Sequence, residues 1–156
     1  MRKTIITTVA LSLIAGFSYA QKVKPAEVPA SVKESFAKNY PKAKVEQWEK
    51  EDGNYEAEFD WNKTESSALF DANGTFKELE QEIKTSALPA GVAGYCKTNF
   101  AGWKLDEASK ITDAAGVVTY EAAMEKKEET FDAFFDDKGA FIKKGEVKKE
   151  DEKEKD

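Results

Sequence analysis

The sequence of 156 residues contains no histidine, and this absence limits its chemistry more than any other feature. Histidine is the commonest general base and the commonest transition-metal ligand in proteins. Ser-His-Asp and Cys-His catalysis are therefore excluded within this chain, and a typical zinc site is not expected. Because no nucleophile motif is present either, the sequence predicts a protein that is not an enzyme. We expect no catalytic residue, no metal ligand and no cofactor.

Cysteine is nearly absent as well. Cys96 is alone, which excludes an intramolecular disulfide. It falls on the apolar stripe of an expected helix, so we interpret it as a small buried apolar side chain. The alternative is a reactive or intermolecular thiol.

Long apolar runs are missing except at the N-terminus, where residues 1–20 have the pattern of a signal peptide. Arg2 and Lys3 precede an apolar stretch from Ile5 to Phe17, and the segment ends in Ser-Tyr-Ala. The stretch is short for a bilayer crossing, so cleavage is favoured over an uncleaved anchor. The sequence therefore predicts a periplasmic or secreted protein that begins near Gln21, without stable membrane insertion.

The charge balance excludes some partners. Without Arg2 and Lys3, 22 basic residues face 30 acidic ones, which gives the mature chain a net charge of −8. A negative protein is a poor ligand for nucleic acid or an anionic membrane.

The chain also repeats itself. Residues 28–45 align with 88–105 at an offset of 60, and further on the offset becomes 65. Five residues are thus gained between Leu105 and Tyr120, where the letters ITDAAG predict a longer hairpin loop. We expect a first repeat at 28–83, a second at 88–147 and a charged, disordered tail at 148–156.

Each repeat begins with a predicted helix. Val32, Phe36 and Tyr40 recur every four residues, and Pro29 suits the first helical turn. Pro41 ends the first helix, and a glycine ends the second.

Strands follow the helices. The letters YEAEFDW alternate strictly between apolar and acidic residues, as a half-buried antiparallel strand does. The strands are expected near residues 44–51, 55–61, 65–71 and 75–83, then 103–112, 120–125, 130–136 and 140–147. The predicted fold class is α+β: a tandem repeat in which each copy is one α-helix followed by a four-stranded antiparallel meander. Neither copy alone buries much core, so we expect the two sheets to join or pack into one unit.

Several of these features, in this order, resemble the PepSY-like, β-lactamase-inhibitor-like family of exported bacterial proteins. The features are the repeated (V/L)PxxV opening, the YPKA after the first helix, Trp48, the Tyr-Glu-Ala strand and the Phe-Asp-x-x-Gly turn. The resemblance covers residues 28–147. The second copy departs from the pattern with Phe-Ala-Gly at 100–102 and with Ala108 opposite Trp48. The resemblance implies tandem α/β repeats in an envelope protein, and it implies no established activity.

The turn motif itself has two interpretations. Asp71 and Gly74 recur as Asp136 and Gly139. A calcium loop needs alternating oxygen ligands, and Lys138 of the second copy would repel a cation. A hairpin turn needs an Asp that binds its own backbone and a Gly with positive φ, which both copies provide. We therefore interpret the four residues as structural turns.

A possible interaction surface is the sheet face that carries the acidic residues of the strands. Nothing in the alternation suggests burial, so a solvated face, a docking surface and, least of all, an acid/base pair remain open. Trp61 lies at a strand end and is expected to be partly exposed. The predicted surface comprises Glu56, Glu58, Asp60, Trp61, Glu121 and Glu125.

These observations favour a non-catalytic, inhibitor-like binding module that uses an open sheet face to bind an unidentified protein or peptide in the cell envelope. The alternative is a periplasmic protein that binds a small ligand or a cation on its carboxylate-rich face.

Overall fold

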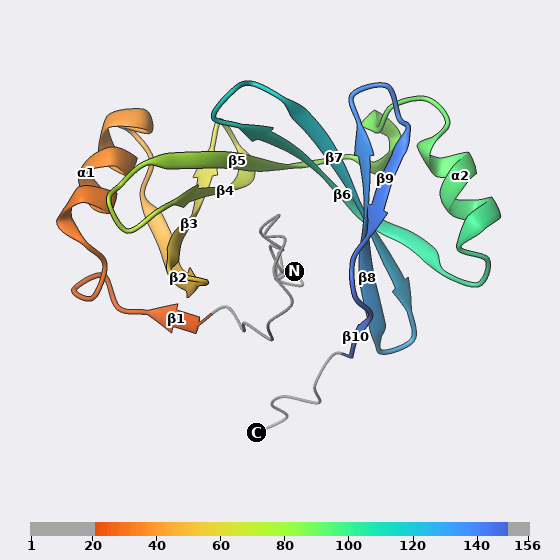
Figure 1. Ribbon diagram of the computed structural model, residues 1–156, viewed down its shortest axis with the longest axis horizontal. Coiled ribbons are helices and arrows are strands. Elements are labelled where there is room, and N and C mark those ends of the chain that lie inside the picture. Colours follow the sequence, from red (N-terminus) through yellow and green to blue (C-terminus); the bar gives the residue numbers. More distant parts are fainter. Residues whose placement is uncertain (1–20, 150–156) are drawn as a thin grey trace. The chain divides into compact units, whose positions relative to one another are not determined.

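The computed structural model describes residues 21–149, which divide between Lys77 and Glu78 into two compact units (Figure 1). The described part of the chain has ten strands, paired antiparallel, and two α-helices. The predicted signal peptide and residues 150–156 of the predicted tail lie outside the described residues.

The first unit contains one helix and a sheet in chain order, β1-β2-β3-β4. Strand β5 begins in this unit and ends in the next. The elements are β1 (Gln21–Val23), α1 (Ala30–Asn39), β2 (Val45–Glu51), β3 (Asn54–Trp61), β4 (Thr64–Phe70) and β5 (Phe76–Ile83).

The second unit has the sheet order β5-β6-β7-β8, and both β9 and β10 pair with β8. A short 3₁₀ turn, η1 (Thr85–Ala87), precedes its helix. The further elements are α2 (Val92–Asn99), β6 (Lys104–Asp113), β7 (Val118–Lys126), β8 (Glu129–Asp136), β9 (Phe141–Lys144) and β10 (Lys148–Lys149).

The predicted helices and strands are present, but the two units are not simple repeats of one helix and four strands. Strand β1 was not predicted, and residues 78–83 of β5 pair with β6. The predicted disorder is wrong at Lys148 and Lys149, which pair with Thr130 and Glu129 of β8. Backbone pairing to an otherwise open strand overrides the charged composition there.

Helix α1 packs its apolar stripe on the sheet of the first unit. Val32, Phe36 and Tyr40 are all buried, as the four-residue spacing predicts. The Phe36 ring contacts four other rings, with centroid distances of 4.9 Å to Phe59 and 5.9 Å to Trp48. This aromatic cluster is the core of the first unit.

Helix α2 packs on the second unit in the same manner, with smaller side chains. Cys96 is 1% exposed and belongs to a core cluster with Met124 and Phe131. The prediction of a buried cysteine is therefore confirmed. Burial also raises the pKa of its thiol, which disfavours the reactive thiolate.

The predicted structural turns are confirmed. Asp71 Oδ1 accepts hydrogen bonds from the backbone N–H groups of Asn73 and Thr75, each at 2.9 Å. Gly74 has a φ of 84° and donates its N–H to the Asp71 carbonyl. Asp136 and Gly139 form the same bonds at the β8–β9 turn.

A third copy of this turn occupies the five-residue insertion between β6 and β7. Asp113 Oδ1 accepts the N–H groups of Ala115 and Val117, and Gly116 has a φ of 81°. The letters DAAG carry the same Asp-x-x-Gly signal as the other two turns, so the sequence could have identified it.

Candidate functional site

Acidic side chains gather on the sheet face of the first unit that points away from α1. Along β3, Tyr55, Ala57 and Phe59 are buried in the core, so the alternating residues Glu56, Glu58 and Asp60 lie on the opposite face. Residues of the flanking strands lie beside these three on the same face, because paired residues of neighbouring strands point to the same side of a sheet. The pairs are Glu49 with Glu56, Gln47 with Glu58, Asp60 with Glu65, and Lys22 with Glu49.

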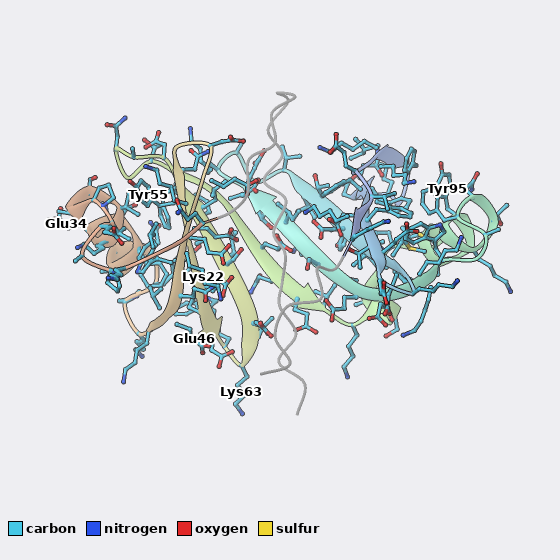
Figure 2. The ribbon with its side chains drawn as sticks, turned by 90° about the horizontal axis from the view of Figure 1, so that it is seen from below. Lys22, Glu34, Glu46, Tyr55, Lys63 and Tyr95 are labelled. Atoms are coloured by element: carbon cyan, nitrogen blue, oxygen red, sulfur yellow. The ribbon has the colours of Figure 1, made fainter. Side chains whose placement is uncertain are left out.

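Glu58 is the electrostatic centre of this acidic face, which we define as Glu49, Glu56, Glu58, Asp60 and Glu65. Its side chain is half-buried, and its pKa is raised to about 7. Loss of solvation is the largest cause, and repulsion by Glu49, Glu56 and Glu65 adds to it. The ammonium group of Lys22, labelled in Figure 2, opposes the shift. The face thus carries more negative charge than its own cation compensates.

The solvation of this face differs from the expectation. Asp60 is exposed, but Glu56 is only 5% exposed, so the predicted solvated face is wrong at Glu56. Alternation identifies the residues that share a face, and it contains no information on what covers that face.

Trp61 does not belong to the acidic face. Its ring lies 5.4 Å from the Tyr40 ring and 6.5 Å from the Phe59 ring, on the helix side of the sheet. It is half-buried, as its position at a strand end predicts. The structure therefore places Asp60 and Trp61 on opposite faces of one strand.

The second unit holds a buried carboxyl group at the equivalent place in β7. Glu121 is 6% exposed, which again contradicts a solvated face. Its carboxyl group is hydrogen-bonded to Asp132, and its pKa is raised by burial first and then by Glu80 and Asp132. Lys148 opposes the shift. Glu80 is 2% exposed and was not singled out in the sequence, because only its pairing along β5 and β6 makes it part of this cluster.

Glu125 lies on the same side of β7 as Glu121, four residues further along. It is half-buried, and Lys104 Nζ lies 4.0 Å from its Oε2. Lys104 also pairs with Asp106. Glu125 therefore belongs to a local charge cluster at the strand end.

Metal binding has no obvious place in the described part of the chain. Among residues 21–149 no three His, Cys, Asp or Glu side chains are placed to hold a metal ion. In the turns, Oδ1 of each aspartate is engaged by two backbone N–H groups. Neither described helix has the length and apolar character that a membrane crossing requires.

Comparison with known proteins supports the sequence resemblance. The family described as "Putative beta-lactamase-inhibitor-like, PepSY-like" matches residues 18–65 and again 61–143. The comparison with curated proteins found no match.

Solved structures with the same fold come from Bacteroides species. One from Bacteroides eggerthii, described as "putative periplasmic proteins", has a TM-score of 0.66 and 17% identity over 75% of this chain and 87% of that one. A DUF2874 family protein from Bacteroides ovatus has a TM-score of 0.63 and 21% identity over 74% and 85%. A BLIP-like protein from Bacteroides fragilis has a TM-score of 0.61 and 19% identity over 81% and 91%. At these identities the likeness shows the fold alone.

Proposed function

The chain belongs to the PepSY-like, β-lactamase-inhibitor-like family, and from this premise we propose that it is an exported, non-catalytic binding module. Its acidic face in the first unit receives a cationic segment of a protein or peptide in the cell envelope. The signal-peptide pattern and a structural neighbour described as periplasmic favour export. The lack of histidine favours binding over catalysis.

The observation that carries the proposal is the set of carboxylates that strand pairing gathers around the half-buried Glu58. A carboxyl group with a pKa of about 7 lies among carboxylates that repel its charged form. A lysine or arginine side chain of a partner would relieve this repulsion, since an opposite charge nearby favours the ionised carboxylate. Asp60 is exposed at the same face and extends the negative surface.

Binding to this face must release protons. At pH 7 Glu58 is close to half protonated, because its pKa is about 7. A cationic partner lowers that pKa, so each binding event releases up to about half a proton at pH 7. The release disappears when Glu58 is replaced by Gln.

The test is calorimetric titration of the mature protein with hexalysine, at low salt and in two buffers of different ionisation enthalpy. We expect a buffer-dependent enthalpy, with weaker binding and no proton release in Glu58→Gln. Glu34→Gln is the matched control, because Glu34 is an exposed carboxylate on α1 (Figure 2). If both variants bound hexalysine equally weakly, the attraction would depend only on the net charge of the protein, and a site at this face would be refuted.

The alternative function, a cation site on the same face, is tested with calcium in place of hexalysine. A cation site on the same face would raise the melting temperature in millimolar calcium, and the Glu58→Gln and Asp60→Asn variants would lose that response. A response to calcium without any binding of hexalysine would replace the proposed partner with a small cation.

A further inference from the structure

Gln21 is both the expected first residue of the mature chain and the first residue of strand β1. Ser18 and Ala20 provide the small side chains that a signal peptidase requires before its cleavage site. Cleavage after Ala20 leaves a free α-amino group on Gln21. A glutamine in this state carries a nucleophilic amine and an electrophilic carboxamide on one residue, at the spacing that closes a five-membered ring.

The side chain of Gln21 is accessible. The residue is exposed, and β1 is the first strand in the order of the sheet, with β2 as its neighbour. Backbone pairing places Gln21 opposite Lys50 of β2. Because the side chain lies at the surface, its carboxamide can turn back to the nitrogen of its own residue without displacing a packed group.

The ring that forms is compatible with this place in the sheet. It joins the backbone nitrogen of residue 21 to Cδ, and therefore has the size and position of a proline ring. Proline within sheets is confined to edge strands, first residues of strands and bulges. Gln21 is the first residue of an edge strand, and its carbonyl group remains an acceptor after cyclisation.

The second unit contains the same strand position without this chemistry. Gln81 of β5 pairs with Lys110 of β6, at the offset of 60 from the pair of Gln21 and Lys50. The nitrogen of Gln81 is a peptide amide within the chain, which is not a nucleophile. The reaction is therefore restricted to the first unit, where the mature chain is expected to begin.

Electrostatics also favours a cyclised first residue. A free α-amino group has a pKa of about 8, so at neutral pH it would add a cation opposite Lys50 and next to Lys22. Like charges directly opposite each other on paired strands are destabilising. The cyclised residue is neutral, so this repulsion is removed.

We propose that Gln21 is a modification site and that the mature chain begins with pyroglutamate. The α-amino nitrogen attacks the side-chain carbon Cδ, and the bond between Cδ and Nε2 breaks. Nε2 leaves as ammonia, with a proton from the attacking amine. The step requires no oxidant, reductant or second substrate. The proposal rests on the export in the proposed function, and it is independent of the partner of the acidic face.

Cyclisation would preserve β1, because aminopeptidases require a free α-amino group. Stepwise trimming would remove Lys22, the cation that opposes the raised pKa of Glu58. It would next remove Val23, the residue that pairs with the buried Trp48. A blocked first residue therefore protects the edge of the first sheet and the charge balance of the acidic face.

Intact-mass spectrometry tests the proposal on wild-type protein exported to the periplasm of a Gram-negative host from the full-length gene. We expect the mass of residues 21–156 less one molecule of ammonia, and fragmentation should locate the loss at residue 21. The unmodified mass of residues 21–156, or a chain that begins at another residue, would overturn the proposal. The mass of the uncleaved precursor would overturn the predicted export as well.

Gln21→Ser is the decisive variant, because it removes the carboxamide and retains a small polar first residue. We expect it to have the unmodified mass and to lose β1 to an added aminopeptidase, to which the wild type is resistant. Gln81→Ser is the matched control and should keep both the loss of ammonia and the resistance. Equal trimming of the wild type and Gln21→Ser would refute a blocked first residue.

Titration of the same wild-type sample with hexalysine separates this proposal from the proposed function. Binding of hexalysine by a protein with an unmodified Gln21 would refute the modification and leave the binding site at the acidic face intact. A cyclised protein that does not bind hexalysine would support the modification alone.

Discussion

The carbonyl oxygen of Ser31 lies 2.5 Å from the point where a Cβ atom on residue 74 would stand. Gly74 thus meets two demands, a left-handed backbone and close contact with the start of α1. Ser31 Oγ also donates a hydrogen bond to the Ala72 carbonyl across the same contact. In the second unit Gly139 approaches the Ala90 carbonyl, 3.0 Å from its own Cβ position. The repeated turn therefore holds the β-hairpin against the start of the helix.

Substitution by alanine should separate the two demands. Gly116 has nearly the same φ as Gly74 but no atom within 4 Å of its Cβ position. Gly116→Ala should cost about 1–2 kcal/mol of unfolding free energy from the left-handed backbone alone. Gly74→Ala should cost a further 1–3 kcal/mol or so, because a backbone carbonyl must move. Urea denaturation of both variants measures the difference, and equal midpoints would show that the contact with Ser31 is unimportant.

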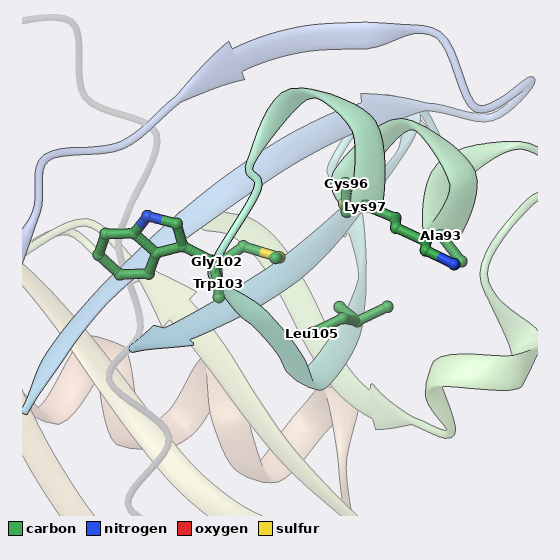
Figure 3. Close-up of a pocket in the computed structure, with 7 residues that line it drawn as sticks. Ala93, Cys96, Lys97, Gly102, Trp103 and Leu105 are labelled. Carbon is green, nitrogen blue, oxygen red and sulfur yellow. The ribbon is translucent and has the colours of Figure 1, made fainter. Parts of the chain in front are cut away.

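Truncation of the buried helix residue should cost far more stability at Phe36 of the first unit than at Cys96 of the second. Phe36→Ala removes a buried ring that contacts four others and should lower the unfolding free energy by about 3–5 kcal/mol. Cys96→Ala removes one sulfur atom beside the pocket that lies against α2 (Figure 3) and should cost about 1 kcal/mol. Denaturant unfolding followed by circular dichroism checks both values. Similar costs would contradict the difference in packing between the two helices.

The pKa of Glu58 should respond to its neighbours in opposite directions. Glu49→Gln removes a repulsive charge and should lower this pKa from about 7. Lys22→Gln removes an attractive charge and should raise it. Carbon-detected NMR titration of the Glu58 carboxyl group measures both shifts. A value near 4.5 in the wild type would remove the electrostatic basis of the proposed function.

Stability should fall as pH rises, in part because of Glu121. Its pKa in the folded protein is raised above the ordinary value of 4.5, so folding favours the protonated form. The stabilisation is complete below pH 4.5 or so and is lost as pH rises toward the folded pKa. Glu121→Gln should therefore flatten the decline in melting temperature as pH rises above about 4.5. Glu128→Gln, at an exposed turn, is the control and should leave the decline unchanged.

Much of the fold could be predicted from local patterns in the sequence. The four-residue spacing of Val32, Phe36 and Tyr40 identified the buried stripe of α1, and Pro41 identified its end. The alternation in β3 identified Phe59 as a core residue. These signals are local because helix and strand periods determine which side chains share a face.

The candidate site was only partly predictable. Glu58 and Asp60 share a face as their spacing predicts, but Glu49 and Glu65 join them through strand register. The Glu80–Glu121 cluster likewise depends on pairing between distant segments. Register is determined by the whole sheet and the turns that connect it.

The sequence by itself determined the order of elements, the parity of the strands and the Asp-x-x-Gly turns, because each depends on a few neighbouring residues. Only the tertiary structure decided that Glu56 and Glu121 are buried, and that a pocket lies against α2 beside Cys96 and Trp103. Burial and cavity volume depend on every segment that packs around a residue, and these segments lie far apart along the chain.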